Sequence, residues 1–164
     1  MKEYEIVYDL LKSLNIDYKV VEHPATYTVE EADKYIEDYE GTRTKTLFLT
    51  NKKKTSFYLL VMRGEDRLDI KALGEKLGAK GLKFVSEDLL MDKLGLKPGF
   101  VSIFGLINNK DKDVKVLFDD RALENNIITF HPNDNTRTMF IAIKDIFKYL
   151  AYLGYEYEVV DIKK

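Results

Sequence analysis

Residues 44–62, TKTLFLTNKKKTSFYLLVM, decide the fold of this chain. Two runs within them, Thr44–Thr50 and Ser56–Met62, are rich in β-branched, aromatic and aliphatic residues, which is typical of strands. The Asn-Lys-Lys-Lys-Thr between them suits a hairpin loop, so we expect the two strands to pair antiparallel. The sequence therefore places a sheet at the centre of the molecule.

Helices and strands are predicted on both sides of this hairpin. Apolar residues recur at helical spacing from Glu3 to Leu14, and Thr28 and Glu31 have the spacing of a capping box before a second, short helix. The same criteria predict three further helices, Asp69–Leu77, Ser86–Leu94 and Lys144–Leu153, and six further strands, Tyr18–Glu22, Leu82–Val85, Val114–Phe118, Ile127–His131, Thr136–Ile143 and Tyr155–Ile162.

One stretch, Lys97–Asn108, breaks the periodic patterns with Pro98, Gly99 and Gly105 and predicts a structured loop that leads into a short strand. Elsewhere strands outnumber helices, and a regular alternation of strand and helix is absent. We therefore expect an α+β fold in one compact domain, residues 1–164, with a mixed, mainly antiparallel sheet surrounded by helices. This pattern argues against a Rossmann-type cofactor site.

The composition excludes several kinds of site. The 164 residues include no cysteine, which removes disulfides, thiolate zinc sites and cysteine nucleophiles. Two histidines, His23 and His131, are too few for a three-histidine metal centre, and no HExxH or EF-hand spacing occurs. We expect no metal and no cofactor.

With 26 basic and 28 acidic side chains, bulk charge does not attract nucleic acid, so any nucleic acid must be held locally.

The N-terminus, MKEYEIVYDLL, carries acidic residues where a signal peptide carries basic ones. The longest apolar runs have the length of strands, not of membrane-spanning helices. We therefore expect a cytoplasmic protein with no membrane partner.

Two polar residues of the predicted strands are candidates for chemistry. Lys45 shares a strand face with Leu47 and Leu49, so its ammonium either reaches water at the strand end or meets an anionic partner at the rim of an apolar surface. His131 ends a predicted strand just before a turn, where site residues are common, although a hydrogen-bonded structural histidine would occupy the same place. His23 offers less support for a catalytic role.

The glycine-flanked segment Gly99–Gly105 brings backbone N–H groups close to a ligand or forms only a tight turn. A dyad of Ser102 and His131 is weakly supported, because no G-x-S-x-G motif surrounds any serine. The run Lys52–Lys54 is the one dense basic patch in the sequence. It is either a solvated hairpin tip or a site that steers an RNA backbone.

Three motifs carry a resemblance to a known family: GTRTKTLFL at 41–49, GLKPGFVSIFGLIN at 95–108 and FHPNDNT at 130–136. In this order they resemble the YbaK/prolyl-tRNA synthetase-associated editing family, and most of all its freestanding alanyl-tRNA(Pro) deacylases. The helical N-terminal segment and the His-Pro-Ala segment at 23–25 fit as well. The resemblance therefore extends over nearly the whole chain.

The resemblance implies a trans-editing enzyme that hydrolyses the ester of mischarged Ala-tRNA(Pro). The family's strand lysine corresponds to Lys45, its loop glycine to Gly99 and its histidine to His131, which are the catalytic candidates. The matching motifs also place Ser102, Phe104, Gly105, Asn135 and Thr136 at the substrate. The implied partners are the acceptor end of aminoacyl-tRNA, in particular tRNA(Pro), and a prolyl-tRNA synthetase.

The chain departs from the family at two positions. The family's Gly-x-x-x-Pro loop ends here in Ile103, and its Asn-Thr-Ala is Asn135-Thr136-Arg137. An alternative function is therefore a non-catalytic module that binds aminoacyl-tRNA or another nucleotide-linked ligand. A plain protein-interaction domain that uses the Lys52–Lys54 patch is a second alternative.

Overall fold

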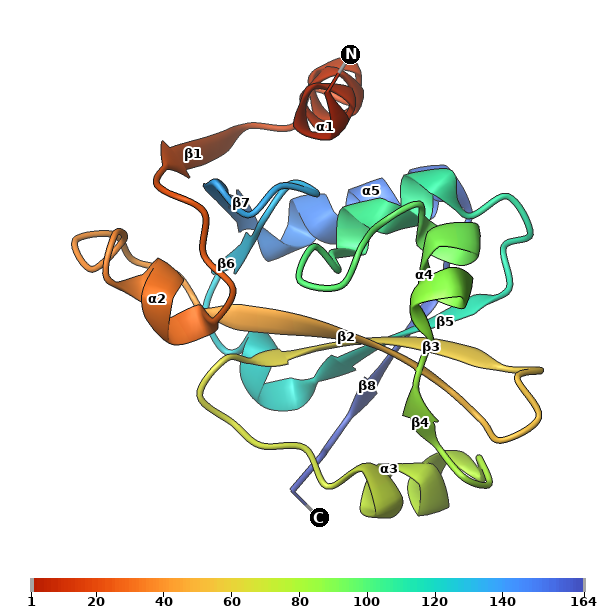
Figure 1. Ribbon diagram of the computed structural model, residues 1–164. Helices are drawn as coiled ribbons and strands as arrows, with labels where there is room; N and C mark the ends of the chain where they lie inside the picture. The colour runs from red at the N-terminus through yellow and green to blue at the C-terminus, as the bar shows by residue number, and fades with distance from the viewer. Residues whose placement is uncertain (1, 164) are drawn as a thin grey trace.

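A computed structural model describes residues 2–163 (Figure 1). Its helices are α1 (Glu3–Ser13), α2 (Val29–Asp33), α3 (Ile70–Leu77), α4 (Glu87–Leu94) and α5 (Ile143–Leu153), with two 3-10 helices, η1 (Ile103–Asn108) and η2 (Asp120–Leu123). Its strands are β1 (Tyr18–Glu22), β2 (Thr44–Thr50), β3 (Phe57–Arg63), β4 (Lys83–Phe84), β5 (Val114–Asp119), β6 (Ile127–Phe130), β7 (Arg137–Ala142) and β8 (Tyr157–Val160).

The expected hairpin of β2 and β3 is confirmed and forms the middle of a five-stranded sheet with the order β4-β2-β3-β5-β8. β2 pairs antiparallel with β3 and β4, whereas β3, β5 and β8 run parallel to one another. Both faces of β3 are buried: Leu59 and Val61 belong to the larger apolar cluster, and Leu60 and Met62 to the smaller one. Burial on both faces explains the unbroken apolar run in this strand.

The remaining three strands form a separate antiparallel sheet with the order β1-β7-β6. Within the described residues, the two sheets meet at one isolated parallel bridge, between Thr42 and Ile128. The ladder ends there because the hydroxyl of Thr129 accepts the N–H of Thr44 at 3.2 Å, in place of a backbone carbonyl. The expected α+β fold with mainly antiparallel pairing is confirmed, but the strands divide into two sheets.

Helices cover both faces of the five-stranded sheet (Figure 1). α3 packs its Leu73 into the smaller apolar cluster, while α4 and α5 contribute to the larger cluster on the opposite face. Over residues 2–163, no helix has the length and apolar character that a membrane crossing requires.

The prediction of a strand after the loop at 97–102 was wrong, because η1 begins at Ile103. Ser102 supplies the cap: its hydroxyl accepts the N–H of Phe104 at 3.2 Å, and its carbonyl accepts the N–H of Gly105 at 3.0 Å. A capping serine favours a helical turn over an extended strand.

The capping box predicted before α2 is confirmed, since the Thr28 hydroxyl accepts the N–H of Glu31 at 3.1 Å.

Candidate active site

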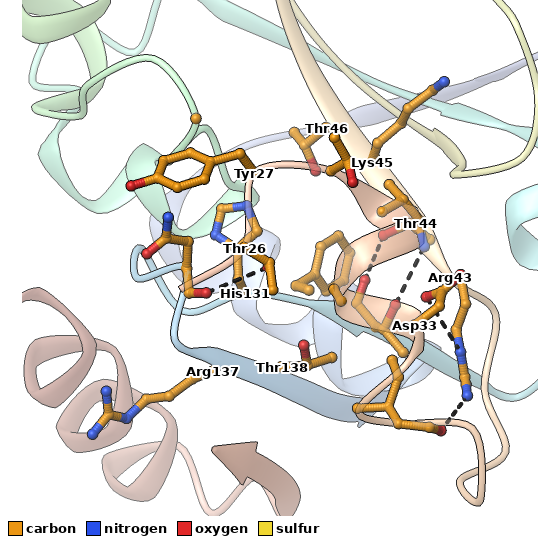
Figure 2. A pocket seen from close by; sticks show the side chains of 18 of the residues that line it. Thr26, Tyr27, Asp33, Arg43, Thr44, Lys45, Thr46, His131, Arg137 and Thr138 are labelled. Carbon is orange, nitrogen blue, oxygen red and sulfur yellow. Dashed lines mark hydrogen bonds and ion pairs between the residues drawn. The ribbon is translucent and has the colours of Figure 1, made fainter. Parts of the chain in front are cut away.

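A pocket of about 320 Å³ opens where the two sheets meet (Figure 2). One wall is the first half of β2, and the opposite wall is the end of β6 with the start of β7. The segment 26–36, which contains α2, and the loop at Gly99 close the remaining sides. The pocket therefore brings together parts of the chain that lie about one hundred residues apart.

Lys45 lines this pocket from β2. Its Nζ donates a hydrogen bond of 2.6 Å to the backbone carbonyl of Asp66, and Figure 2 shows the side chain extending away from His131. The Asp66 carboxylate is in turn held by Arg63 at 2.8 Å and by Lys163 at 3.2 Å. The ammonium is thus half-buried at the pocket rim with a neutral acceptor.

His131 follows the end of β6 and also lines the pocket. Its Nδ1 is buried and has no hydrogen-bond partner within residues 2–163. Burial lowers the pKa of His131 to about 4, although the nearby Asp134 carboxylate acts to raise it. The imidazole is therefore neutral at pH 7, and its shielded Nδ1 lacks a hydrogen-bond partner among the described residues.

Gly99 lines the pocket on the loop before η1. Its φ of +86° lies in the left-handed region that a side chain disfavours. An added Cβ would lie 3.5 Å from Cδ1 of Tyr27, which is an ordinary contact distance. Backbone conformation, not lack of space, therefore requires glycine at this position.

Three predicted substrate-binding residues lie behind the pocket and do not line it. The hydroxyl of Ser102 donates to the backbone carbonyl of His131 at 2.7 Å, so it anchors the histidine and does not form a dyad with its ring. Phe104 is fully buried and packs edge-on against Phe130 and Tyr149. At Gly105 a Cβ would approach Leu96 to 2.8 Å, which makes this glycine a packing requirement of the core.

Asn135 does line the pocket, whereas Thr136 does not. The side chain of Asn135 is only 6% exposed, and its Nδ2 has no hydrogen-bond partner in the described chain. Thr136 is tied to its own turn, because its backbone N–H donates to Asp134 at 2.7 Å. Of the eight residues predicted from the sequence, the structure brings Lys45, Gly99, His131 and Asn135 together around the pocket.

Several pocket residues were not identified from the sequence. The Nε2 atom of His23 lies 2.9 Å from the Thr138 hydroxyl, and its Nδ1 atom lies 2.9 Å from the Pro24 carbonyl oxygen. Both ring nitrogens therefore have hydrogen-bond partners. Arg43 donates to the backbone carbonyls of Gly41, Ile36 and Tyr39 and fastens the segment after α2. Both residues lie within segments that carry the family resemblance, His23 at 23–25 and Arg43 at 41–49, but neither was assigned to the site from the sequence.

Arg137, where the chain departs from the family motif, lies at the pocket edge. Its guanidinium carbon sits 3.6 Å from the centre of the Tyr4 ring on α1, and one of its nitrogens lies 3.5 Å from the Glu22 carboxylate. Figure 2 shows the guanidinium pointing towards α1. Arg137 therefore links α1 to the second sheet.

The Lys52–Lys54 patch lies at the hairpin tip, at the opposite end of β2 from the pocket (Figure 1). Five residue steps of strand lead from Lys45 to Thr50 at the end of β2, which corresponds to about 17 Å, and the turn that carries the patch lies beyond Thr50. The patch is therefore not adjacent to the pocket.

Comparison with known proteins identifies the family. Residues 23–149 match the model of the aminoacyl-tRNA editing domain. The chain is 34% identical over 152 residues to the prolyl-tRNA editing protein ProX of Acetoanaerobium sticklandii, with 93% of each chain covered. It is 31% identical to prolyl-tRNA synthetase associated domain-containing protein 1 of Mus musculus, over 89% of this chain and 88% of the mouse protein.

A proline–tRNA ligase from Aquifex aeolicus is 30% identical over 61% of this chain, but that match covers only 17% of the ligase. Among solved structures, a candidate trans-editing enzyme for prolyl-tRNA synthetase superposes with a TM-score of 0.75 at 22% identity, covering 100% of this chain and 98% of the other. That likeness concerns the fold. The family match and the identity to the ProX protein show that the chain is an aminoacyl-tRNA deacylase that belongs to the aminoacyl-tRNA editing domain family.

Proposed function

We propose that this chain is a cytoplasmic trans-editing deacylase that hydrolyses Ala-tRNA(Pro), with residues 1–164 acting as one editing domain. The observation that carries the proposal is the meeting of Lys45, Gly99 and His131 around one pocket of about 320 Å³. The 34% identity to a prolyl-tRNA editing protein over nearly the whole chain supports proline tRNA as the carrier.

The reaction needs no protein nucleophile, because an aminoacyl ester is already reactive. Water supplies the oxygen: it adds to the ester carbon, and the bond from that carbon to the ribose oxygen then breaks. The products are the free amino acid and the ribose hydroxyl of the tRNA. The protein accelerates this step by holding the ester in place and by stabilising the negative oxygen that develops.

The loop N–H groups of Gly99 and Val101 are assigned to the developing oxyanion, because the intervening N–H of Phe100 already donates to the carbonyl of Lys97 at 3.0 Å. The left-handed backbone at Gly99, with φ at +86°, turns the loop towards the pocket. Backbone N–H groups in such a loop are fixed before the substrate arrives, so they stabilise charge without reorganisation. The Ser102 hydroxyl, bonded to the His131 carbonyl at 2.7 Å, holds this loop against the second sheet.

His131 is assigned to the ribose hydroxyl beside the ester. Since burial lowers the pKa of His131 to about 4, its imidazole is neutral and one ring nitrogen accepts a hydrogen bond. The unpartnered Nδ1 supports this assignment, because a buried polar atom without a partner costs about 1–3 kcal/mol unless a ligand satisfies it.

Lys45 is assigned to the phosphate or ester of the terminal nucleotide. Its acceptor in the free protein is the neutral carbonyl of Asp66. An anionic phosphate is a stronger partner for an ammonium than a carbonyl, so the side chain exchanges one acceptor for the other when substrate binds.

The apolar pocket wall is assigned to the amino acid. Val29, Ala32 and Ile36 from the α2 segment line the cavity together with Leu47 and Val101. A synthetase pocket built for proline cannot strongly exclude the smaller alanine, whereas a second, smaller pocket admits alanine and excludes proline. A prolyl-tRNA synthetase is the partner that would release such a mischarged tRNA.

The decisive experiment is a single-turnover competition between the alanine and proline esters of the same tRNA(Pro). We expect faster cleavage of the alanine ester. Equal or faster cleavage of the proline ester would overturn the size-based selection, and a lack of hydrolysis of both would leave the non-catalytic binding module as the function.

A further inference from the structure

Tyr27 is an exposed aromatic residue at the mouth of the pocket. Its side chain is 69% exposed, although the residue lines the cavity. Its ring lies beside the glycine loop, since a Cβ on Gly99 would be 3.5 Å from Cδ1. Within residues 2–163 it has no aromatic partner, whereas the similarly exposed Tyr35 stacks on His23 at 5.5 Å. One aromatic face is therefore free at the point where a ligand enters.

The backbone on both sides of Tyr27 is fixed. The N–H of Tyr27 donates to the Glu31 carboxylate at 3.2 Å, and the N–H of Glu31 donates to the Thr28 hydroxyl at 3.1 Å. On the other side, the N–H of Thr26 donates to the carbonyl of Asn135 at 3.1 Å. The ring thus stands on a rigid segment, so placing it against a ligand costs little conformational entropy.

Asn135 provides a second, independent observation beside Tyr27. Its side chain is 6% exposed and lines the pocket, and its Nδ2 has no partner among the described residues. A buried amide donor without an acceptor is unfavourable unless a ligand supplies that acceptor. Because Thr26 is hydrogen-bonded to Asn135, the free amide and the free ring lie on neighbouring segments.

We propose that Tyr27 and Asn135 form the subsite for the terminal adenine base of the tRNA. The Tyr27 ring stacks on the base, and the Asn135 side chain turns its shielded Nδ2 towards the cavity and donates to one of the ring nitrogens of the base. Every base offers a π-face to an aromatic ring, and asparagine is a favoured partner for the edge of adenine. This subsite rests on the proposed function, which places the 3′-terminal nucleotide in the same pocket.

A base subsite predicts a preference that can be measured without catalysis. The probes are adenosine 5′-monophosphate and ribose 5-phosphate, which share the sugar and the phosphate but differ in the base. Wild-type protein should bind the adenosine compound more tightly in a titration followed by NMR or calorimetry. Loss of one aromatic stacking contact should weaken its binding about five- to 150-fold.

The variants are Tyr27→Leu, Tyr27→Phe and Asn135→Ala, with Tyr152→Leu as a matched control. Tyr152 is 61% exposed on α5 and does not line the pocket. Tyr27→Leu and Asn135→Ala should both reduce the preference for the adenosine compound, while Tyr27→Phe and Tyr152→Leu should keep it. Binding of ribose 5-phosphate should stay the same in all four variants. Because Asn135 is only 6% exposed, Asn135→Ala should lower the melting temperature slightly, and thermal melts check that the variant is folded at the temperature of the titration.

Two results would overturn the subsite: equal binding of the two probes by the wild type, or an unchanged preference in Tyr27→Leu. Equal losses for both probes would also overturn it, since they would indicate a general structural effect. The deacylation assay on Ala-tRNA(Pro) is a separate readout. A wild type that cleaves the ester but shows no base preference retains the proposed function and loses only this subsite.

Discussion

Among residues 2–163, the ammonium of Lys45 has the neutral Asp66 carbonyl as its one hydrogen-bond acceptor, at 2.6 Å. This contact explains how a lysine can stand beside Leu47 on the edge of an apolar cluster without a carboxylate partner. A charge held this way is available to an anionic substrate, because the exchange of acceptors breaks no ion pair.

Lys45→Ala should therefore remove most deacylation while the protein stays folded. The loss of one contact to a developing charge corresponds to about 2–4 kcal/mol, or roughly a thirty- to thousandfold slower reaction. Lys45→Arg should recover only part of the rate, because the planar guanidinium has a different shape. Single-turnover hydrolysis of Ala-tRNA(Pro) and thermal melts measure the two effects. A wild-type rate in Lys45→Ala would show that the lysine is only a strand-end residue.

His131 should make the stability of the protein depend on pH. Burial lowers the pKa of His131 to about 4, below the value of about 6.5 for an unfolded histidine. Between these two pH values the unfolded chain binds a proton that the folded imidazole does not, so the free energy of unfolding falls as the pH drops through this window. The loss of stability is about 3 kcal/mol at pH 4 and becomes negligible about one pH unit above 6.5.

Denaturant titrations of wild type and His131→Gln between pH 4 and 7.5 test this prediction. The stability of the wild type relative to the variant should decrease as the pH falls below 6.5. A constant difference in the free energy of unfolding between the two proteins would mean that the imidazole is not excluded from solvent.

The deacylation rate should show no titration of His131 between pH 6 and 8, because the ring is neutral throughout that range.

At the scale of secondary structure, α2 forms a pocket wall and rests on a glycine of the neighbouring turn. An ideal Cβ at Gly64 would collide with Cγ1 of Val29 and approach its Cγ2 to 3.0 Å. Gly64 therefore lets α2 lie directly against the end of β3. Arg43 then holds the segment after α2 through the carbonyls of Ile36 and Tyr39.

Gly64→Ala should displace α2, lower the melting temperature and slow deacylation. Overpacking of this kind costs about 1–3 kcal/mol. The double variant Gly64→Ala, Val29→Ala removes both colliding methyl groups and should regain most of the lost stability. Thermal melts of the single and double variants provide the comparison. If the double variant is no more stable than Gly64→Ala, the contact with Val29 is not the cause of the loss.

At the scale of the whole molecule, charge limits how tRNA is held. With 26 basic and 28 acidic side chains, the surface has no excess of positive charge, and the Lys52–Lys54 patch lies at the far end of β2. Binding of tRNA should therefore depend only weakly on salt, with a log–log slope of about −2 to −3, as for three or four phosphates. Replacing Lys52, Lys53 and Lys54 with serine should leave this slope unchanged. A slope that corresponds to about ten phosphates, or a flatter slope in the serine variant, would reveal a wider RNA surface.

Much of the architecture follows from local sequence. Three kinds of feature depend on residues only a few positions apart in the chain. They are the hairpin at 44–62, the helix caps at Thr28, Asp69 and Ser86, and the left-handed glycines at the helix ends. The 3-10 helix after Ser102 was missed because the glycines and the apolar residues there suggested an extended chain. The division into two sheets was missed because it depends on the Thr129 side chain, which meets Thr44 across 85 residues of sequence.

The sequence by itself determined the family motifs, the lack of a cysteine nucleophile and the candidate residues Lys45, Gly99 and His131. Only the tertiary structure decided that the Lys45 ammonium rests on Asp66, that burial lowers the pKa of His131 and that Tyr27 lies near Asn135. The physical reason is the range of the interactions. Caps, turns and strand patterns arise between near neighbours in the chain, whereas the pocket and its electrostatics arise from contacts such as that between Thr26 and Asn135, 109 residues apart.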